Sequence, residues 1–348
     1  MEISNGVKKI FFLILILLIL GGIFIWQGTY LPRSEFTLLW GLPKSIGVGK
    51  SITFTVEEGQ GSKEIAHNLQ REGLIRWALI FRAYVMLKGV AGKLQAGEYI
   101  LSSAMSIPEI VKKIVSGDVL KQQITIIEGW NLRDIGTYFE KAGVCSEEEL
   151  FETVSKDFSD EFDFLADKPK NLGLEGYLFP DTYEIRKGES LEDIVRKMLN
   201  NFDKKLTPGL KEEIKRQGKT IFEIVTMASI LEKEVRTLED KEIVSGIFWK
   251  RIKERLSLQS CATIAYIKGV NQWQYSYEDT RIKSPYNTYL NLGLTLGPIS
   301  NPGIDSIEAA IFPKKTDYNY FLTDPATEKT IFSKTYEEHN INKAKYFK

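Results

Sequence analysis

An uncharged apolar segment near the N-terminus constrains this chain more than any other feature of its sequence. Residues 10–26 read IFFLILILLILGGIFIW and contain no charged side chain. At 1.5 Å per residue, a helix over this segment is near the short end of what spans a bilayer. Lys8 and Lys9 precede it and Tyr30 follows, which favours a cytoplasmic N-terminus and an aromatic residue at the far interface. We therefore predict a cytoplasmic stub and a single-pass transmembrane anchor over residues 1–32.

A cleaved signal peptide is the alternative interpretation of the same segment. Its apolar region would be long for a signal peptide, and no A-x-A-like cleavage site follows it. An uncleaved anchor places everything after about Pro32 outside the cytoplasm, beginning with a linker over residues 33–51. ATP-driven chemistry is disfavoured there, and the sequence has no P-loop pattern.

Composition narrows the classes of function. Lysine and arginine together number 46, as do aspartate and glutamate, so the net charge is zero across 348 residues. A balanced chain without a basic block gives no support for nucleic-acid binding. The two cysteines, Cys145 and Cys261, are far apart in sequence, and so are the two histidines, His67 and His339. We predict two buried, unpaired thiols, no metal site and no cofactor, and the sparse histidines disfavour a Ser-His-Asp triad.

Two segments of the N-terminal half share one pattern at a fixed offset of 70 residues. Each consists of an apolar strand, a glycine turn and an amphipathic helix that ends at a second glycine. The matching positions are Phe54, Gly59, Ile65, Leu69 and Gly73 in the first copy and Ile124, Gly129, Ile135, Phe139 and Gly143 in the second. Between the copies we predict a strand over 94–101 and a helix over 106–115. Small units of strand and helix outside the membrane suit a binding or positioning module.

The rest of the sequence mixes helices with loops. Residues 146–167 indicate an acidic helix and loop, and residues 174–183 (LEGYLFPDTY) an aromatic turn. We predict long helices over 191–202 and 222–255. Beyond them, aromatic residues, glycine and proline are frequent up to Phe321, which is typical of loops that form a site. The predicted fold class is α+β.

One glutamate occupies a helix position that the periodicity assigns to an apolar residue. The buried stripe of the segment 220–235 consists of Ile224, Met227, Ala228 and Leu231. Its next position is Glu234, and burial among aliphatic groups raises the pKa of a carboxyl, so that it keeps the proton a general acid needs. The alternative is a helix-edge charge that reaches water. The neighbouring Glu232 has a simpler role, because Arg236 is placed for a surface ion pair and can pair again with Asp240.

Four short blocks follow one another from this helix onward. They are 228–234 (ASILEKE), 258–263 (LQSCAT), 284–289 (SPYNTY) and 297–303 (GPISNPG). Six aromatic residues lie in or between the second and third blocks, namely Tyr266, Trp273, Tyr275, Tyr277, Tyr286 and Tyr289. The C–H faces of a sugar ring stack on aromatic rings, while its hydroxyls need directional partners such as Gln259, Thr263 and Asn287. Packing in the core or in loops is the alternative for each aromatic residue taken singly.

In these residues the chain resembles the YceG-like endolytic murein transglycosylases (MltG type). The resemblance covers nearly the whole chain: the membrane anchor, a LysM-like module, the EGYLFPDTY turn and all four blocks. It implies that the second glutamate of the E-K-E block, Glu234, is the catalytic residue. The family often has L-Q-x-D-P-T at the second block, so the cysteine at position 261 leaves no aspartate to assign there. It also often has L-P-P-G-P where this chain has LTLGP at 294–298.

The resemblance implies a domain order and a site. A small LysM-like αβ module is expected over 52–122, and a larger mixed α/β catalytic domain over 123–348 that includes the second repeat at 124–146. The expected saccharide contacts are Gln259, Thr263, Tyr266, Ser284, Tyr286 and Asn287. Glu175 and Asp181, in the aromatic turn, are reserve acids whose simpler role is to stabilise the turn.

The resemblance also implies a mechanism with one carboxyl group. Glu234 would protonate the glycosidic oxygen between N-acetylmuramic acid and N-acetylglucosamine. The carboxylate would then accept the proton of the muramyl C6 hydroxyl as that oxygen attacks C1, an internal attack that benefits from proximity. The product is a 1,6-anhydro end. The expected setting is the bacterial plasma membrane, where nascent glycan strands are cut in the company of peptidoglycan synthases (penicillin-binding proteins).

Two rival functions predict different products. A non-catalytic envelope scaffold would bind glycan with or without Glu234 and would create no anhydro ends. A hydrolytic glycosidase would use Glu234 with Glu232 or Asp181 as its second carboxylate. Its products would carry one added water, which the anhydro product lacks.

Overall fold

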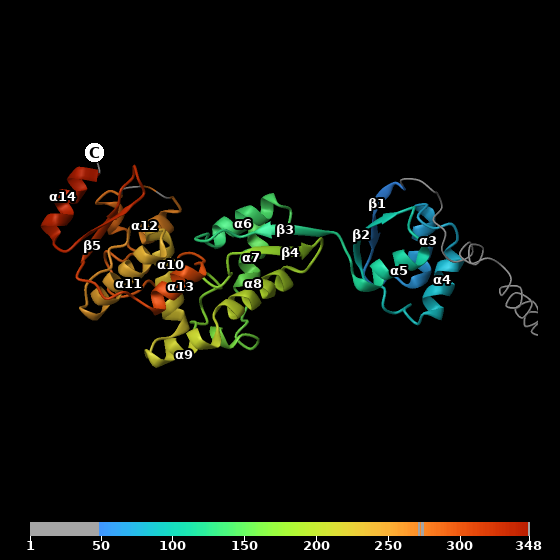
Figure 1. Ribbon diagram of the computed structural model, residues 1–348, viewed down its shortest axis with the longest axis horizontal. Helices are drawn as coiled ribbons and strands as arrows, with labels where there is room; N and C mark the ends of the chain where they lie inside the picture. Colours follow the sequence, from blue (N-terminus) through green and yellow to red (C-terminus); the bar gives the residue numbers. More distant parts are fainter. Residues whose placement is uncertain (1–48, 271, 273–274, 347–348) are drawn as a thin grey trace, which may run out of the picture. The chain divides into compact units, whose positions relative to one another are not determined.

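The computed structural model describes residues 49–270, 272 and 275–346, and Figure 1 shows their helices and strands. Contacts between residues divide the chain into two units, the first ending at Lys121 and the second beginning at Gln122. The boundary predicted from the sequence lies one residue further on. Within the described ranges, no helix is both long enough and apolar enough to cross a membrane. The predicted anchor and nearly all of the predicted linker lie outside the described residues.

The first unit is built on a two-stranded antiparallel sheet. β1 (Ser51–Val56) pairs with β2 (Gly97–Ser102), with Phe54 opposite Tyr99. Along β1, Phe54 and Val56 are buried and the residues on either side of Phe54 are not, the period of two that one buried face produces. Three helices share the hydrophobic core of this sheet: α3 (Ser62–Arg71), α4 (Ala78–Leu87) and α5 (Ile107–Ser116).

In this unit one predicted helix and one predicted strand are found in the structure, and one further helix is not predicted. The helix predicted over 106–115 is confirmed as α5, which begins with a capping box of Ser106 and Glu109 and ends at Gly117. The strand predicted over 94–101 is β2, which begins later, at Gly97. Helix α4 is not predicted by the pattern, because its sequence ALIFRAYVML is apolar on most sides. The LysM-like character of the unit stays a prediction.

The two copies of the repeat have the same local structure. The second copy consists of β3 (Lys121–Thr125) and α6 (Leu132–Lys141). Its apolar positions are buried like their counterparts in the first copy. The turn glycines Gly59 and Gly129 have φ angles of +81° and +79°, and the glycines that follow the helices have +71° and +68°. Only glycine adopts this left-handed conformation without a steric penalty, which explains why the glycines recur at the same offset.

Helix α10 (Ile221–Glu234) is the central helix of the second unit (Figure 1). It contacts α9 (Pro208–Arg216), α11 (Leu238–Lys253), α12 (Cys261–Lys268) and α13 (Ile304–Ile311). All residues from Ile224 to Leu231 are buried. The predicted single stripe is therefore too narrow, because neighbouring helices enclose this helix on every side.

The segment predicted as helical over 222–255 contains a break. Helix α10 ends at Glu234, since Val235 is extended with φ −145° and ψ +158°. Thr237 then caps α11 by accepting a hydrogen bond from the backbone N–H of Asp240. The break places Glu234 at the last position of α10, where its side chain reaches beyond the helix.

The remaining elements surround these helices with small sheets, so the predicted α+β class is confirmed. They are α7 (Glu147–Val154), η1 (Asp163–Leu165), β4 (Thr182–Arg186), α8 (Leu191–Lys205), η2 (Asp279–Arg281), β5 (Tyr320–Thr323), β6 (Thr330–Ser333) and α14 (Tyr336–Tyr346). Strand β3 pairs with β4, and β5 forms an antiparallel hairpin with β6. The start of the aromatic turn at 174–183 is confirmed as irregular, whereas its last two residues begin β4.

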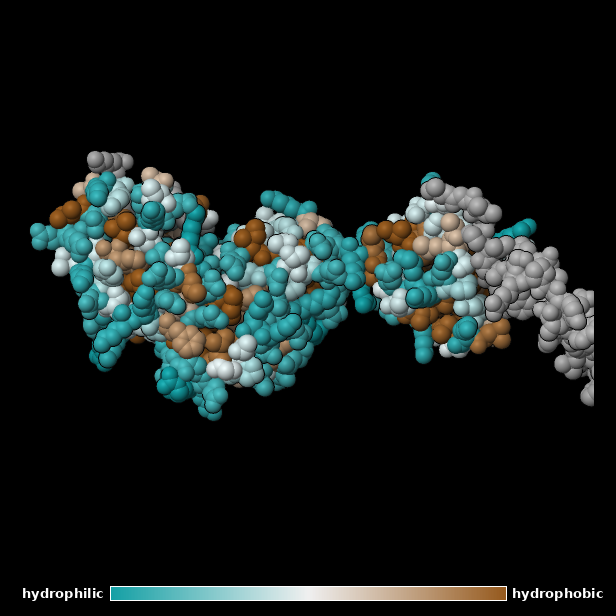
Figure 2. All heavy atoms as spheres, viewed as in Figure 1, coloured by the Kyte–Doolittle hydropathy of each residue, from teal (hydrophilic) through white to brown (hydrophobic). Residues whose placement is uncertain are grey.

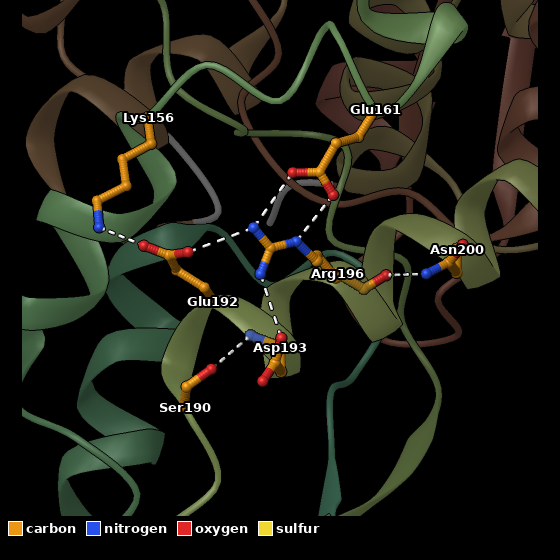
Figure 3. Close-up of polar contacts among 7 residues, drawn as sticks. All are labelled: Lys156, Glu161, Ser190, Glu192, Asp193, Arg196 and Asn200. Atoms are coloured by element: carbon orange, nitrogen blue, oxygen red, sulfur yellow. Dashed lines mark hydrogen bonds and ion pairs between the residues drawn. The ribbon is translucent and has the colours of Figure 1, made fainter.

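An ion-pair network joins α8 to the segment that follows α7 (Figure 3). The Arg196 guanidinium donates to both carboxylate oxygens of Glu161, at 2.8 and 3.2 Å, and to Glu192 and Asp193 at 3.3 and 3.1 Å. Lys156 donates to Glu192 at 2.5 Å. The surface over α8 is hydrophilic (Figure 2), and these side chains are solvent-accessible, so the network positions the segment more than it stabilises the fold.

Candidate active site

The carboxyl of Glu234 is held at the start of α12. Its Oε1 accepts a hydrogen bond from the Ser260 hydroxyl and another, at 3.2 Å, from the backbone N–H of Ala262. Both donors lie at the N-terminus of α12, where free N–H groups and the helix dipole favour negative charge. The Glu234 residue is partly buried. The predicted alternative, a helix-edge charge in open water, does not describe this carboxyl.

Two opposing effects set the pKa of Glu234. Burial favours the neutral acid and is the larger effect. The bonds from Ser260 and Ala262 and the charge of Arg251 favour the carboxylate. The net result raises the pKa of Glu234 above the ordinary value of 4.5. A carboxyl in this balance keeps its proton above the ordinary range and is also stabilised after it loses the proton, as a group that acts first as acid and then as base requires.

The surroundings of this carboxyl are more polar than the apolar stripe implies. The four stripe residues are fully buried, as predicted. The carboxyl, however, interacts with Ser260, with Arg251 of α11, and with Cys261 and Tyr289, whose own pKa values its charge raises. These partners come from segments distant in sequence, so helix periodicity could not reveal them.

Cys261, the first residue of α12, is the nearest thiol to this carboxyl. Its sulfur lies 3.1 Å from the Tyr289 hydroxyl. Desolvation of the sulfur and the charge of Glu234 raise the pKa of the thiol, so Cys261 stays neutral near pH 7. Both cysteines are unpaired, as predicted, but Cys261 is exposed and Cys145 only partly buried, so their predicted burial is wrong.

The 258–263 block is braced by Thr288. The N–H of Gln259 donates to the Thr288 carbonyl at 3.1 Å, and the N–H of Ser260 donates to the Thr288 hydroxyl at 3.0 Å. The buried Thr263 hydroxyl lies 2.7 Å from the Ser260 carbonyl and 3.0 Å from the Thr288 hydroxyl. Gln259 is exposed and has a φ of +54°, a strained value for a residue other than glycine. Thr263 thus positions the block, while the Gln259 residue faces solvent.

The 284–289 block is held by Asn287. This residue is completely buried, and its amide donates to two backbone carbonyls of the same loop, at 3.0 and 2.8 Å. Its Oδ1 accepts from the Tyr289 N–H at 2.9 Å. Ser284 accepts from the N–H of Tyr286 at 3.2 Å. In this conformation Asn287 and Ser284 shape the loop, and their predicted contacts with saccharide stay predictions.

Tyr266 and Tyr286, with ring centroids 5.1 Å apart, line a pocket of about 210 Å³. The pocket wall includes Glu175, whose carboxyl accepts from the Leu132 N–H at 3.2 Å and from the Tyr266 hydroxyl at 3.4 Å. Desolvation raises the pKa of Glu175 to about 8. Glu175 is therefore a neutral acid at pH 7 rather than an ordinary turn residue.

Gly176 packs the turn that carries Glu175 against the fourth block. Its φ is +90°, and a Cβ there would lie 2.6 Å from Pro298 and 2.8 Å from Val225 of α10. Asn301, which is fully buried, donates from its amide to Glu175 at 3.3 Å. The aromatic turn, the fourth block and α10 are therefore in contact in the fold, although they are separate motifs in the sequence.

Glu232 is a structural residue of the interior. Its side chain is 9% exposed and pairs at 3.1 Å with Lys241, which is 4% exposed. Its second oxygen accepts from a backbone N–H and from the Ser306 hydroxyl at the start of α13, at 2.9 and 2.7 Å. This carboxylate joins α10, α11 and α13 just before the Glu234 position.

The predicted surface pairs of Arg236 are wrong. Arg236 pairs with Glu328, and Asp240 accepts a hydrogen bond from Thr330 at 3.0 Å. The physical reason is the break between α10 and α11. Arg236 lies within this break, outside both helices, so it shares a helical face with neither Glu232 nor Asp240.

Asp181 has the simpler role that the sequence suggests. It accepts from Asn201 at 3.0 Å and from the Thr182 N–H at 2.8 Å, and these bonds lower the pKa of Asp181. It stabilises the turn at the start of β4.

Ser260 is the site residue that sequence reasoning did not single out. It occupies the N-cap position of α12, where a serine usually caps its own helix. Here its side chain makes no such bond and donates to Glu234 instead. A serine at a predicted N-cap downstream of a candidate acid is a weak signal, and the distance of 26 residues conceals the contact.

This geometry defines a candidate general-acid site on an α+β scaffold, and comparison with known proteins specifies the family. The sequence profile of the YceG-like family matches residues 54–345. The chain belongs to the YceG-like family.

Named relatives and a solved structure agree with this assignment. The endolytic murein transglycosylase of Bacillus subtilis (strain 168) is 34% identical over 94% of this chain and 91% of its own. That of Streptococcus pneumoniae (strain D39) is 32% identical over 88% of this chain, which spans 60% of the pneumococcal protein. The crystal structure of a yceG-like protein from Listeria monocytogenes, 33% identical, matches 85% of this chain and 100% of its own with a TM-score of 0.56.

Proposed function

We propose that this chain is an endolytic murein transglycosylase, a lytic enzyme in which Glu234 is the general acid and base. The observation that carries the proposal is the Glu234 carboxyl itself, with a raised pKa and one oxygen bound to the N-terminus of α12. The names of the Bacillus and Streptococcus relatives support the reaction class.

In this proposal the two carboxyl oxygens of Glu234 have different roles, which their hydrogen bonds support. Oε1 accepts from Ser260 and Ala262, so the proton of the neutral acid belongs on Oε2. Among the described residues Oε2 has no hydrogen-bond partner, and it is the oxygen that would face the glycosidic bond. The donors on Oε1 then stabilise the carboxylate as the proton leaves.

The reaction that fits this site uses one carboxyl twice. Oε2–H protonates the glycosidic oxygen between N-acetylmuramic acid and N-acetylglucosamine as its bond to C1 breaks. The muramyl C6 oxygen bonds to C1, and its proton passes to the Glu234 carboxylate. The balance closes without water, leaving a 1,6-anhydro-muramyl end and a free hydroxyl on the departing sugar. Gln259, an exposed residue of its block, is the proposed polar contact for saccharide next to the acid.

A hydrolytic glycosidase has less support in this fold. It needs a second carboxylate, for which the sequence offers Glu232 and Asp181. Glu232 is engaged by Lys241 and Ser306, and Asp181 by Asn201 and its own turn. Each carboxylate is bound to structural partners, and it would have to break those bonds to act as a base or nucleophile.

The proposed setting is the outer face of the bacterial plasma membrane. An anchor over residues 1–32 would hold the enzyme there by a single span with its N-terminus in the cytoplasm. The substrate would be nascent glycan strands, presented by peptidoglycan synthases. The first unit would serve as a LysM-like module that binds or positions glycan.

The dependence of the rate on pH tests the protonation state of Glu234. Because its pKa is raised, the acid form persists above pH 4.5 and is lost as pH rises through the higher value. We expect the basic limb of kcat/KM, measured by release of soluble muropeptides, to lie above 4.5. A limb at or below that value would contradict the shielded carboxyl. Glu175 has a pKa of about 8, so any second limb near that pH is assigned to its ionisation. The Glu175→Gln variant should lack a limb near pH 8 and keep the limb of Glu234.

A further inference from the structure

The pocket beside Tyr266 is not used by the mechanism above, although it lies close to the acid. Ala262 binds the Glu234 carboxyl, and Tyr266 follows it by four residues on the same helix. Four residues advance an α-helix by about 6 Å, roughly the length of one sugar ring. The pocket therefore opens at a distance suited to a group carried by the sugar that is cleaved.

The size of the pocket limits what it holds. A volume of about 210 Å³ is below the range of roughly 300–1,000 Å³ that is usual for ligand pockets. It suits a substituent rather than a length of strand. Glycan strands of peptidoglycan carry such a substituent on each muramyl residue, a lactyl group extended by a peptide with free carboxylates.

The charges of the pocket favour an acidic peptide over a neutral sugar. Arg133, an exposed residue, places its guanidinium 5.4 Å from the Tyr266 ring centroid and donates to the Tyr266 carbonyl at 3.3 Å. These contacts hold the guanidinium over the ring and use one of its nitrogens, which leaves other N–H groups for a carboxylate. Glu175, neutral at pH 7, offers an O–H donor that suits a peptide carbonyl.

We propose that this pocket binds the carboxylate-bearing peptide of the muramyl residue at the cleaved bond. Arg133 pairs with a peptide carboxylate and Glu175 donates to a peptide carbonyl, beside the rings of Tyr266 and Tyr286, which contact each other in the pocket wall. The inference rests on the proposed function, since it names the part of the murein strand that the same site recognises.

Binding to an inert enzyme tests the pocket without any cleavage. The full chain carrying Glu234→Gln is titrated with N-acetylmuramyl-L-alanyl-D-glutamate and with the same compound amidated at both glutamate carboxyls. We expect amidation to raise the Kd at least tenfold, because a charge-assisted hydrogen bond is lost. Adding Arg133→Gln should erase the difference between the two probes. The control Arg71→Gln, at a site in the first unit with 72% of the side chain exposed, should preserve it.

Equal affinities for the two probes, or a difference that survives Arg133→Gln, would overturn the proposal. Failure to detect binding at millimolar concentrations of the probe would also overturn it.

The pH dependence of binding through Glu175 is an independent test. Affinity in the parent should fall as pH rises through about 8. With Glu175→Gln it should not, because the amide keeps a donor at every pH, whereas Glu175→Ala should weaken binding throughout. A fall of the same size in the Glu175→Gln variant would contradict the role of Glu175.

Strand digestion separates failure of the pocket from failure of the proposed function. The ratio of kcat/KM for peptide-bearing strands to that for strands stripped of peptide is compared between wild type and Arg133→Gln. We expect this ratio to fall at least tenfold in the variant. An unchanged ratio contradicts the pocket alone. If wild type cuts neither kind of strand, the proposed lyase is wrong, while the binding titration still decides what the pocket holds.

Discussion

Replacing Glu234 with glutamine should abolish the release of anhydro-muropeptides from purified glycan strands while leaving the fold nearly intact. Glutamine keeps an oxygen that can accept from Ser260 and Ala262, so the junction of α10 and α12 survives. It has no proton to give to a glycosidic oxygen. Loss of general acid–base catalysis lowers a rate by about 10²–10⁴-fold, and here one group serves as both acid and base. The measurement is chromatography of muropeptides released from uncrosslinked strands.

Glu223→Gln is the matched control on the same helix. Glu223 closes the capping box at the start of α10, a role that glutamine also fills. This variant should retain nearly wild-type turnover and the same circular dichroism spectrum. Undiminished turnover by Glu234→Gln would remove the basis of the assignment, and equal losses in both variants would show a general effect on the helix instead.

The largest loss of stability is expected from replacing Lys241 with methionine. This substitution should lower the free energy of unfolding by about 3–5 kcal/mol. The change leaves Glu232 buried without its counter-charge. Glu128 adds to the penalty. Burial raises the pKa of Glu128, and the nearby charge of Glu232 raises it further. Urea denaturation of the second unit, followed by tryptophan fluorescence, measures the effect.

Two further variants isolate the cause of that loss. Lys253→Met, at an exposed position in the last turn of the same helix, should change stability by no more than about 0.5 kcal/mol. Adding Glu232→Leu to Lys241→Met should recover part of the stability, because no unpaired charge then remains inside. A loss below about 1 kcal/mol in Lys241→Met would mean that Glu232 reaches water, contrary to its burial.

Local patterns account for what the sequence predicts well. The repeat is visible because both copies need a left-handed glycine after the strand and another after the helix. The capping box at Ser106 marks the start of α5 for the same kind of reason, since all its bonds are made within one turn. Glu234 is identified as a candidate because the interrupted apolar pattern of α10 is also local.

Contacts between distant segments account for what the sequence does not predict. The role of Glu232 depends on Lys241 and Ser306, which the helix break at Val235 and the later α13 bring to it. Helix α10 is enclosed by α9, which precedes it, and by α11, α12 and α13, which follow it, so its single stripe is only part of its buried surface. The neutral state of Glu175 depends on burial beneath segments far along the chain, which no local pattern encodes.

The most direct test of the central claim is to digest uncrosslinked strands in ¹⁸O-labelled water and weigh the new muramyl ends. A lyase that relies on Glu234 and an internal nucleophile should give ends one water lighter than hydrolysis products, without label. The Glu234→Gln variant should give no new ends. Muramyl ends that contain one ¹⁸O atom would show that water is the nucleophile, and would contradict the single-carboxyl lyase described for this chain.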